Sequence, residues 1–198
     1  MKSNYPVIAL KGYVRQISQR NRGVGEIEVY SVTNSEGFTK STDYFSKEVF
    51  SKDVSNYKMV CTGQFAYNPS RINVGSIDYL KCTERALVSP LYIVFETSSK
   101  IHPDYLLRYL KADWGNLQIR ANTEGAVRDS LKFKGLESIK IPLPPLYDQI
   151  RISHLLRKVE GLIARRKENL QQLAVTTTGS AGVGSPMAYS PGTVVSRL

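Results

Sequence analysis

Short runs of alternating or continuous apolar residues mark the first 147 residues of the chain. Glu26–Thr33 alternates and is rich in β-branched and aromatic residues, which is the pattern of a half-buried strand. Leu91–Glu96 is a continuous apolar run, as expected of a buried strand. The tetrapeptide Asn68–Arg71 separates two further runs and predicts a turn. The predicted strands are Glu26–Thr33, Met59–Tyr67, Ile72–Ile77, Leu91–Glu96 and Ile139–Ile141.

A helical spacing follows Pro103, a residue suited to the first position of a helix. Apolar residues then mark one face, and Gly115 is placed to end the helix. The residues of this face are Leu106, Leu107, Leu110 and Trp114. A second helix is predicted around Thr123–Phe133. The fold class that follows is a mixed α+β domain rich in short strands, with a long helix after it.

The long helix is predicted over Asp148–Ala174, where apolar residues recur at alternating spacings of four and three. This is a heptad seam with one polar interruption at Arg166, and Leu155 and Leu162 widen the stripe. Such a face needs a cover, either from the helix's own domain or from another chain. The length and regularity of the seam favour another chain. The seam residues are Ile152, Leu156, Val159, Ile163, Arg166, Leu170 and Leu173.

The last segment, residues 175–198, is rich in Thr, Ser, Gly and Pro and has no amphipathic period. It is therefore predicted to be a low-complexity, disordered tail. A vector remnant, a natural linker and part of an interrupted longer gene would all have this composition. The expected organisation is a globular domain over 1–147, a long helix over 148–174 and this tail.

Composition narrows the class of protein. Lys and Arg number 27 against 17 Asp and Glu, a formal net charge of +10 that favours a polyanionic partner. The two cysteines, Cys61 and Cys82, exclude a disulfide scaffold and suggest a reducing compartment. Neither a membrane span nor an export signal is apparent, so a cytoplasmic location is expected. Cysteines and histidines lack zinc-site spacing, and we expect no metal.

Motifs for an enzyme acting alone are missing. The sequence has no phosphate-binding GxxxxGK[ST] loop, no GxGxxG, no GxSxG and no HExxH. Asn68-Pro69-Ser70-Arg71 faintly resembles the Asn-Pro-Pro-aromatic loop of amino-methyltransferases, but the stacking aromatic residue is replaced by arginine. Asp129 and Glu137 are too loosely spaced for a nuclease metal site. We therefore expect a protein that is not itself an enzyme and binds no cofactor.

Basic, aromatic and amide side chains recur instead along the chain, and many of them fall in segments predicted to be loops. Arginine and lysine suit guanine and phosphate, and asparagine suits adenine. Any single one could belong to a solvated basic surface, but the set as a whole favours DNA. The candidate DNA-binding residues are Lys11, Tyr13, Arg15, Arg20, Arg22, Lys40, Tyr44, Tyr67, Asn68, Arg71, Asn73, Arg120, Asn122, Arg128 and Lys132.

Four stretches together resemble the specificity subunits of type I restriction–modification enzymes. They are TGQFAYNPSRINVGSI (Thr62–Ile77), VSPLYIVFE (Val88–Glu96), PDYLLRYL (Pro103–Leu110) and the run from Gly125 to Leu156 that passes through IPLPPLYDQ into the long helix. The resemblance covers about Ile8 to Leu173. It implies a target recognition domain followed by a spacer helix, which directs DNA methyltransferase (modification) subunits and, in a restriction complex, translocating subunits. The methyl donor and ATP would belong to those partners.

A full subunit of that family is expected to hold two recognition domains and two antiparallel helices, and this chain has one of each. It therefore resembles a half-subunit, and two copies pairing through the seam would read an interrupted palindrome in double-stranded DNA. The alternative is a coiled-coil assembly protein that binds nucleic acid without sequence preference. Salt dependence is expected in both cases, whereas a large preference for one sequence is expected only in the first.

Overall fold

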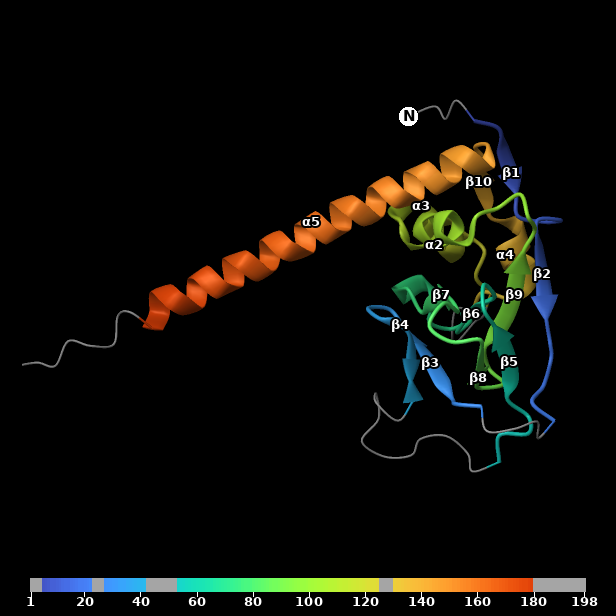
Figure 1. Cartoon of the computed structure of the whole chain (residues 1–198). Helices are drawn as coiled ribbons and strands as arrows, with labels where there is room; N and C mark the ends of the chain where they lie inside the picture. Colours follow the sequence, from blue (N-terminus) through green and yellow to red (C-terminus); the bar gives the residue numbers. More distant parts are fainter. Residues whose placement is uncertain (1–4, 23–26, 42–52, 125–129, 180–198) are drawn as a thin grey trace, which may run out of the picture. The chain divides into compact units, whose positions relative to one another are not determined.

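The sheets of the N-terminal domain are organised around β6 (Phe65–Tyr67). In the computed structural model, residues 5–22, 27–41, 53–124 and 130–179 are described, and they fall into two units that meet at His154 and Leu155. β6 pairs in antiparallel fashion with β7 (Ile77–Tyr79) and β9 (Ile93–Thr97), and β9 pairs with β2 (Val14–Ile17). The result is a four-stranded antiparallel sheet of order β2-β9-β6-β7 (Figure 1).

Both faces of this sheet are covered. Successive side chains of a strand point to opposite faces, and in β6 Phe65 and Tyr67 enter one hydrophobic core while Ala66 enters another. The same alternation sends Phe95 to the first core and Val94 to the second. A strand buried on both faces is apolar throughout, which is why both strands read as continuous apolar runs.

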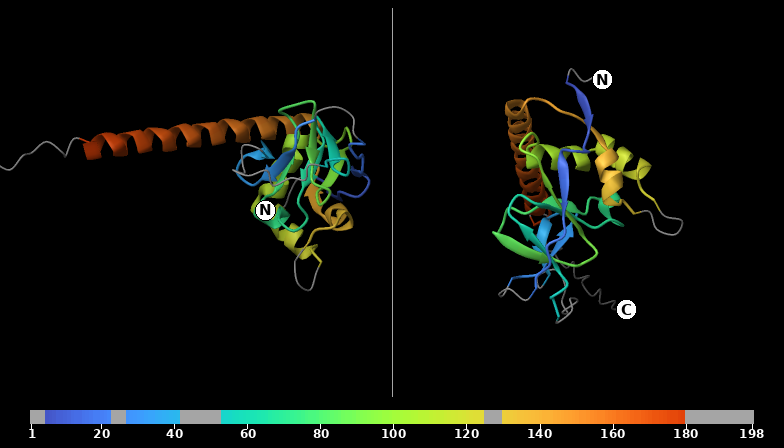
Figure 2. Two further views of the ribbon diagram at one scale, coloured as in Figure 1. Left: turned by 90° about the horizontal axis from the view of Figure 1, so that it is seen from below. Right: turned by 90° about the vertical axis from the view of Figure 1, so that its right-hand side faces the viewer.

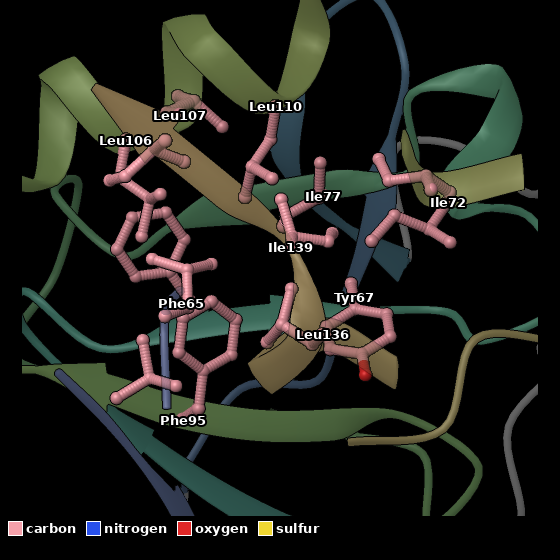
Figure 3. Close-up of a cluster of buried hydrophobic side chains, with 14 of the residues drawn as sticks. Phe65, Tyr67, Ile72, Ile77, Phe95, Leu106, Leu107, Leu110, Leu136 and Ile139 are labelled. Carbon is pink, nitrogen blue, oxygen red and sulfur yellow. The ribbon is translucent and has the colours of Figure 1, made fainter. Parts of the chain in front are cut away.

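Helices and the ends of the domain complete the first core. α2 (Pro103–Lys111) directs Leu106, Leu107 and Leu110 towards Phe65 and Phe95, whose rings stack at 4.8 Å between centroids (Figure 3). α3 (Asp113–Ala121) and α4 (Phe133–Ser138) follow, and β10 (Lys140–Pro142) pairs with β1 (Val7–Ala9). The start and the end of the domain are thereby joined.

Two small antiparallel pairs build the second core. β3 (Tyr30–Thr33) forms a hairpin with β4 (Gly37–Lys40), and β5 (Lys58–Cys61) pairs with β8 (Arg85–Val88). Their inward side chains pack against Ala66 and Val94 on the far face of the central sheet. The mixed α+β class predicted from the sequence is confirmed.

Three predicted strand boundaries are wrong. Met59–Tyr67 is two strands, because Gly63 adopts a left-handed φ of 83° and turns the chain between β5 and β6. Ile72–Ile77 begins as the 3₁₀ helix η1 (Ile72–Val74), and Gly75, with φ 90°, ends it before β7. β3 covers only the second half of Glu26–Thr33, whose first residue lies outside the described part of the chain. The strands predicted at Leu91–Glu96 and Ile139–Ile141 are present, each displaced slightly.

The helix predictions also need correction. α2 starts at Pro103 as predicted, but it ends at Lys111, and Trp114 lies on α3 with 72% of its surface exposed. Gly115 does not end a helix; it lies inside α3, where a Cβ would sit 2.1 Å from the Tyr109 carbonyl oxygen. Glycine is needed there because α3 crosses closely over the end of α2. Of the helix predicted around Thr123–Phe133, residues 123–124 and 130–132 are not helical, Phe133 is the first residue of α4, and 125–129 lie outside the described residues.

The long helix α5 runs from Leu146 to Gly179 as one uninterrupted element (Figure 2). It starts two residues before the predicted helix and includes the first five residues of the predicted tail; 180–198 lie outside the described residues. Its first turns are fixed by Gln149, which is fully buried. The Gln149 amide accepts a hydrogen bond from the His102 N–H at 2.8 Å and donates to the Lys100 and Pro144 carbonyls at 2.9 Å each. Among the described residues, no helix is long and apolar enough to cross a membrane.

Candidate nucleic-acid interface

The loop Asn68–Ser76, between β6 and β7, is held by its own backbone. The Asn68 side-chain Oδ1 accepts from the Ser70 N–H at 3.1 Å, and the Asn68 carbonyl accepts from the Arg71 N–H at 3.0 Å. The Arg71 carbonyl accepts from the Val74 and Ser76 N–H groups, each at 3.1 Å. Both main-chain polar groups of Arg71 are therefore engaged, while its side chain is exposed.

A cavity of about 210 Å³ lies between this loop and the turn of the β3–β4 hairpin. Polar side chains dominate its lining, which includes Asn68 and Arg71 of the predicted site. The sequence analysis missed the hairpin residues, although Asn-Ser-Glu-Gly between two short apolar runs is a turn signal. The lining residues are Ser31, Val32, Thr33, Asn34, Ser35, Asn68, Arg71, Val74, Ser76 and Tyr92.

The hairpin is attached firmly to the rest of the domain. The Ser76 hydroxyl donates to the Val32 carbonyl at 2.6 Å, and the Val32 N–H donates to the Tyr92 hydroxyl at 3.3 Å. The Lys111 ammonium donates to the Asn34 carbonyl at 3.1 Å. Burial lowers the pKa of Lys111, and the nearby Asp78 carboxylate partly opposes that shift. The two walls of the cavity are thus held together by direct hydrogen bonds.

A second groove gathers basic and amide groups near β5. It is lined by Ser18, Gln19, Arg20, Arg22, Ser55 and Asn56. The Arg20 guanidinium donates to the Asn56 side-chain oxygen at 3.2 Å, and an isolated antiparallel bridge pairs Arg20 with Lys58 of β5. Burial chiefly, and then the Arg20 charge, lowers the pKa of Lys58. Arg20 and Arg22, predicted from the sequence, are therefore brought together.

Three predicted DNA contacts are engaged in ion pairs with glutamates that the sequence analysis did not assign to them. Arg15 and its glutamate lie 81 positions apart on paired strands, whereas the partners of Lys40 and Lys132 lie 12 and 8 positions away. A surface pair of this kind contributes little stability, so its cation can still turn to a phosphate. The pairs are Arg15 with Glu96 (Nε to Oε1 2.9 Å), Lys40 with Glu28 (2.6 Å) and Lys132 with Glu124 (3.0 Å).

The prediction that Tyr67 contacts DNA is wrong. Its side chain has no exposed surface, lies in the core beside Phe95, and donates from its hydroxyl to the Leu131 carbonyl at 3.1 Å (Figure 3). Burial raises the pKa of Tyr67 above its ordinary value. An aromatic residue at the end of a strand can equally pack inward, and alternation along β6 places Tyr67 on the side of Phe65.

The remaining candidates are dispersed. Arg120 donates to the Asn116 side chain at 3.0 Å, and Asn122 donates to the Gln118 carbonyl at the end of α3. The Asn73 carbonyl accepts from the Asn116 amide at 2.8 Å, and Tyr13 packs partly against the first core. Lys11 is exposed beside the turn at Gly12. Tyr44 and Arg128 lie outside the described residues.

The seam residues of α5 divide in two. Ile152 packs partly against the first core of its own domain, so it belongs to the anchored root of the helix. From Leu155 onward the seam is exposed, with Val159 and Ile163 each at 50%. The coiled coil stays a prediction. The exposed seam residues are Leu155, Leu156, Val159, Leu162, Ile163, Arg166, Leu170 and Leu173.

Comparison with known proteins gives one family. The sequence model of the type I restriction modification DNA specificity domain matches residues 5–174, so the chain belongs to that family. A protein of Methanocaldococcus jannaschii named as the MjaX specificity subunit of a type I restriction enzyme is 38% identical over 69 residues, which are 35% of this chain and 15% of that protein.

Solved structures agree in fold. The HsdS subunit from Thermoanaerobacter tengcongensis matches with a TM-score of 0.63 and 16% identity, over 96% of this chain and 52% of that one. A chain from a study of complex assembly and conformational transition of the type I R-M system matches with a TM-score of 0.58 and 14% identity, over 89% and 43%. The present chain spans about half the length of these structures or less.

The structural role of Tyr67 can be tested directly. The substitution Tyr67→Phe should lower the free energy of unfolding by about 1 to 2 kcal/mol, because it leaves the buried Leu131 carbonyl without its hydrogen bond. Urea denaturation measures the change. Tyr147→Phe, at an exposed position of α5, is the matched control and should have no effect. Unchanged stability together with an altered DNA preference would contradict the assignment of Tyr67 to the core.

Proposed function

We propose that this protein is a non-catalytic, sequence-specific DNA-binding subunit that directs a DNA methyltransferase to its target. The observation that carries the proposal is the rigid cavity between the β3–β4 hairpin and the loop Asn68–Ser76, with an exposed arginine on its rim. Readout of bases requires side chains held in register with the groove, whereas non-specific binding requires only positive charge. Membership of the specificity-domain family supports the same conclusion.

The two polar sites suit different parts of DNA. Phosphate contacts position a protein on the duplex and depend mainly on charge. The groove at Arg20 and Arg22, with Lys58 close by, supplies that charge. The cavity at Asn68 and Arg71 supplies directed hydrogen-bond donors. We therefore assign phosphate binding to the groove and base recognition to the cavity.

The family resemblance also leads us to propose protein partners in addition to the DNA. Modification subunits would carry the methyl donor and the chemistry, and a restriction subunit would add ATP-driven translocation. This chain would supply only the recognition of the target sequence and would bind no cofactor of its own. Its place of action would be the cytoplasm, where the genome of a prokaryote lies.

The exposed seam of α5 leads us to propose pairing with a second copy of the chain. Between Leu155 and Leu173 the seam places apolar residues at heptad spacing on one side of the helix, with half or more of Val159, Leu162 and Ile163 accessible. A two-fold, antiparallel pair would bury both seams in one interface. The two recognition domains would then face inverted copies of one half-site, separated by a fixed spacer.

DNA binding is tested by selection from a pool of random duplexes, followed by affinity measurements across salt concentrations. The chain should enrich one motif and bind it at least about 1,000-fold more tightly than random DNA. Replacing both Arg20 and Arg22 with alanine should reduce the slope of log affinity against log salt by about 2 while the motif stays the same.

Arg165→Ala on α5, also exposed and basic, is the control for loss of charge alone and should change neither slope nor motif. Equal affinity for selected and random duplexes would contradict the proposed function. That outcome would favour the alternative, an assembly protein that binds nucleic acid without sequence preference.

Pairing through α5 is tested by introducing charge into the seam. Val159→Asp together with Ile163→Asp should convert a dimer into a monomer, because pairing would bury two carboxylates. The matched control is Gly161→Asp with Ala164→Asp, which adds the same charge on the other side of the helix; a Cβ at Gly161 has no atom within 4 Å. Light scattering at micromolar concentration reports the mass. A monomeric unmutated chain would contradict the pairing.

A further inference from the structure

The cavity beside Arg71 presents hydrogen-bond donors, and many of its acceptors are already in use. Asn68 Oδ1 is occupied by the Ser70 N–H, which turns the amide so that its Nδ2 group is the one left to bind a ligand. Thr33 Oγ1 accepts from the Glu36 N–H. The Tyr92 hydroxyl accepts from the Val32 N–H. Among the ten lining residues there is no aspartate or glutamate.

Arg71 differs from most of the other predicted cations. Arg15, Lys40 and Lys132 are paired with glutamates, and Arg20 and Arg120 each donate to an asparagine. The Arg71 guanidinium makes no hydrogen bond or ion pair with the described residues, yet its backbone N–H and carbonyl are both fixed. The next residue, Ile72, is 1% exposed and anchors the loop in the first core. Within the described part of the chain, the guanidinium is therefore unpaired while the backbone that carries it is held by hydrogen bonds.

Donors of this kind select among base edges. Guanine offers two adjacent acceptors, O6 and N7, in the major groove, and the planar fork of arginine matches them. Adenine is read by an asparagine whose amide accepts and donates at the same time, whereas the Asn68 oxygen is turned towards the Ser70 N–H of its own loop, which leaves the nitrogen as the better placed group. A phosphate would also accept from Arg71, but it does not need the fixed backbone that this loop provides.

We propose that Arg71, with the Asn68 Nδ2 group beside it, recognises the O6 and N7 edge of a guanine in the target. This inference rests on the proposed function and adds a specific base to it. The motif bound by this chain then contains a G·C pair at the position that faces the loop Asn68–Ser76. Asn34 and Ser35, on the opposite wall of the cavity, lie next to the same base pair.

The test uses the full chain and the duplex obtained by selection, with each guanine replaced in turn by 7-deazaguanine, which lacks the N7 acceptor. At one guanine the unmutated protein should lose roughly 5- to 150-fold in affinity. Arg71→Ala should lose a similar factor on the unmodified duplex and nothing further on the 7-deaza duplex. It should also accept any base pair at that position. Arg20→Ala should keep the full penalty for 7-deazaguanine.

Several results would overturn the inference. Independent, additive losses from Arg71→Ala and from every 7-deazaguanine would show that the two groups do not meet. Uniform weakening on all duplexes, with the motif unchanged, would make Arg71 a phosphate contact. A motif without guanine would refute the base assignment while leaving the proposed function intact. The absence of any motif would refute both. An unchanged melting temperature for Arg71→Ala, whose side chain has no partner among the described residues, confirms that folding is not the cause.

Discussion

The hydrogen bond from the buried Tyr67 hydroxyl to the Leu131 carbonyl is the constraint on which the candidate site depends. Tyr67 is the last residue of β6, and its ring packs in the first core while the chain leaves the sheet at Asn68. Leu131 in turn donates its N–H to the Pro69 carbonyl at 3.0 Å. The loop that carries Arg71 is therefore tied at its start to a distant, buried segment. The loop backbone that carries Arg71 therefore has little conformational freedom left to lose on binding.

Patterns that depend on burial alone were predictable from the sequence. The strand at Leu91–Glu96, the start of α2 at Pro103 and the long helix followed from apolar runs, proline and heptad spacing. Glycines were the main source of error, because their role depends on what lies next to them. Gly63 splits one predicted strand through its left-handed backbone. Gly115 lets α3 cross closely over the end of α2, so it lies inside α3 and does not end the helix that starts at Pro103.

The candidate site was predictable in part, for a similar reason. Asn68 and Arg71 were found because turn residues and basic residues coincide there, and Arg20 and Arg22 were found through their charge. The ion pair of Arg15 with Glu96 depends on the register of β2 against β9, in which these two residues are direct partners 81 positions apart. No local pattern contains that register. In the same way, the sequence around Tyr67 does not by itself indicate that this side chain points into the core while the neighbouring Asn68 lines the cavity.

The central claim is that this chain supplies the sequence specificity of a DNA methyltransferase. Mapping of methylated bases across the genome of the source organism, with the gene intact and with it deleted, tests that claim most directly. We expect one set of methylated sites that share a split motif with inverted half-sites, and methylation of the whole set should disappear with the gene. An identical methylation map in both strains would contradict it.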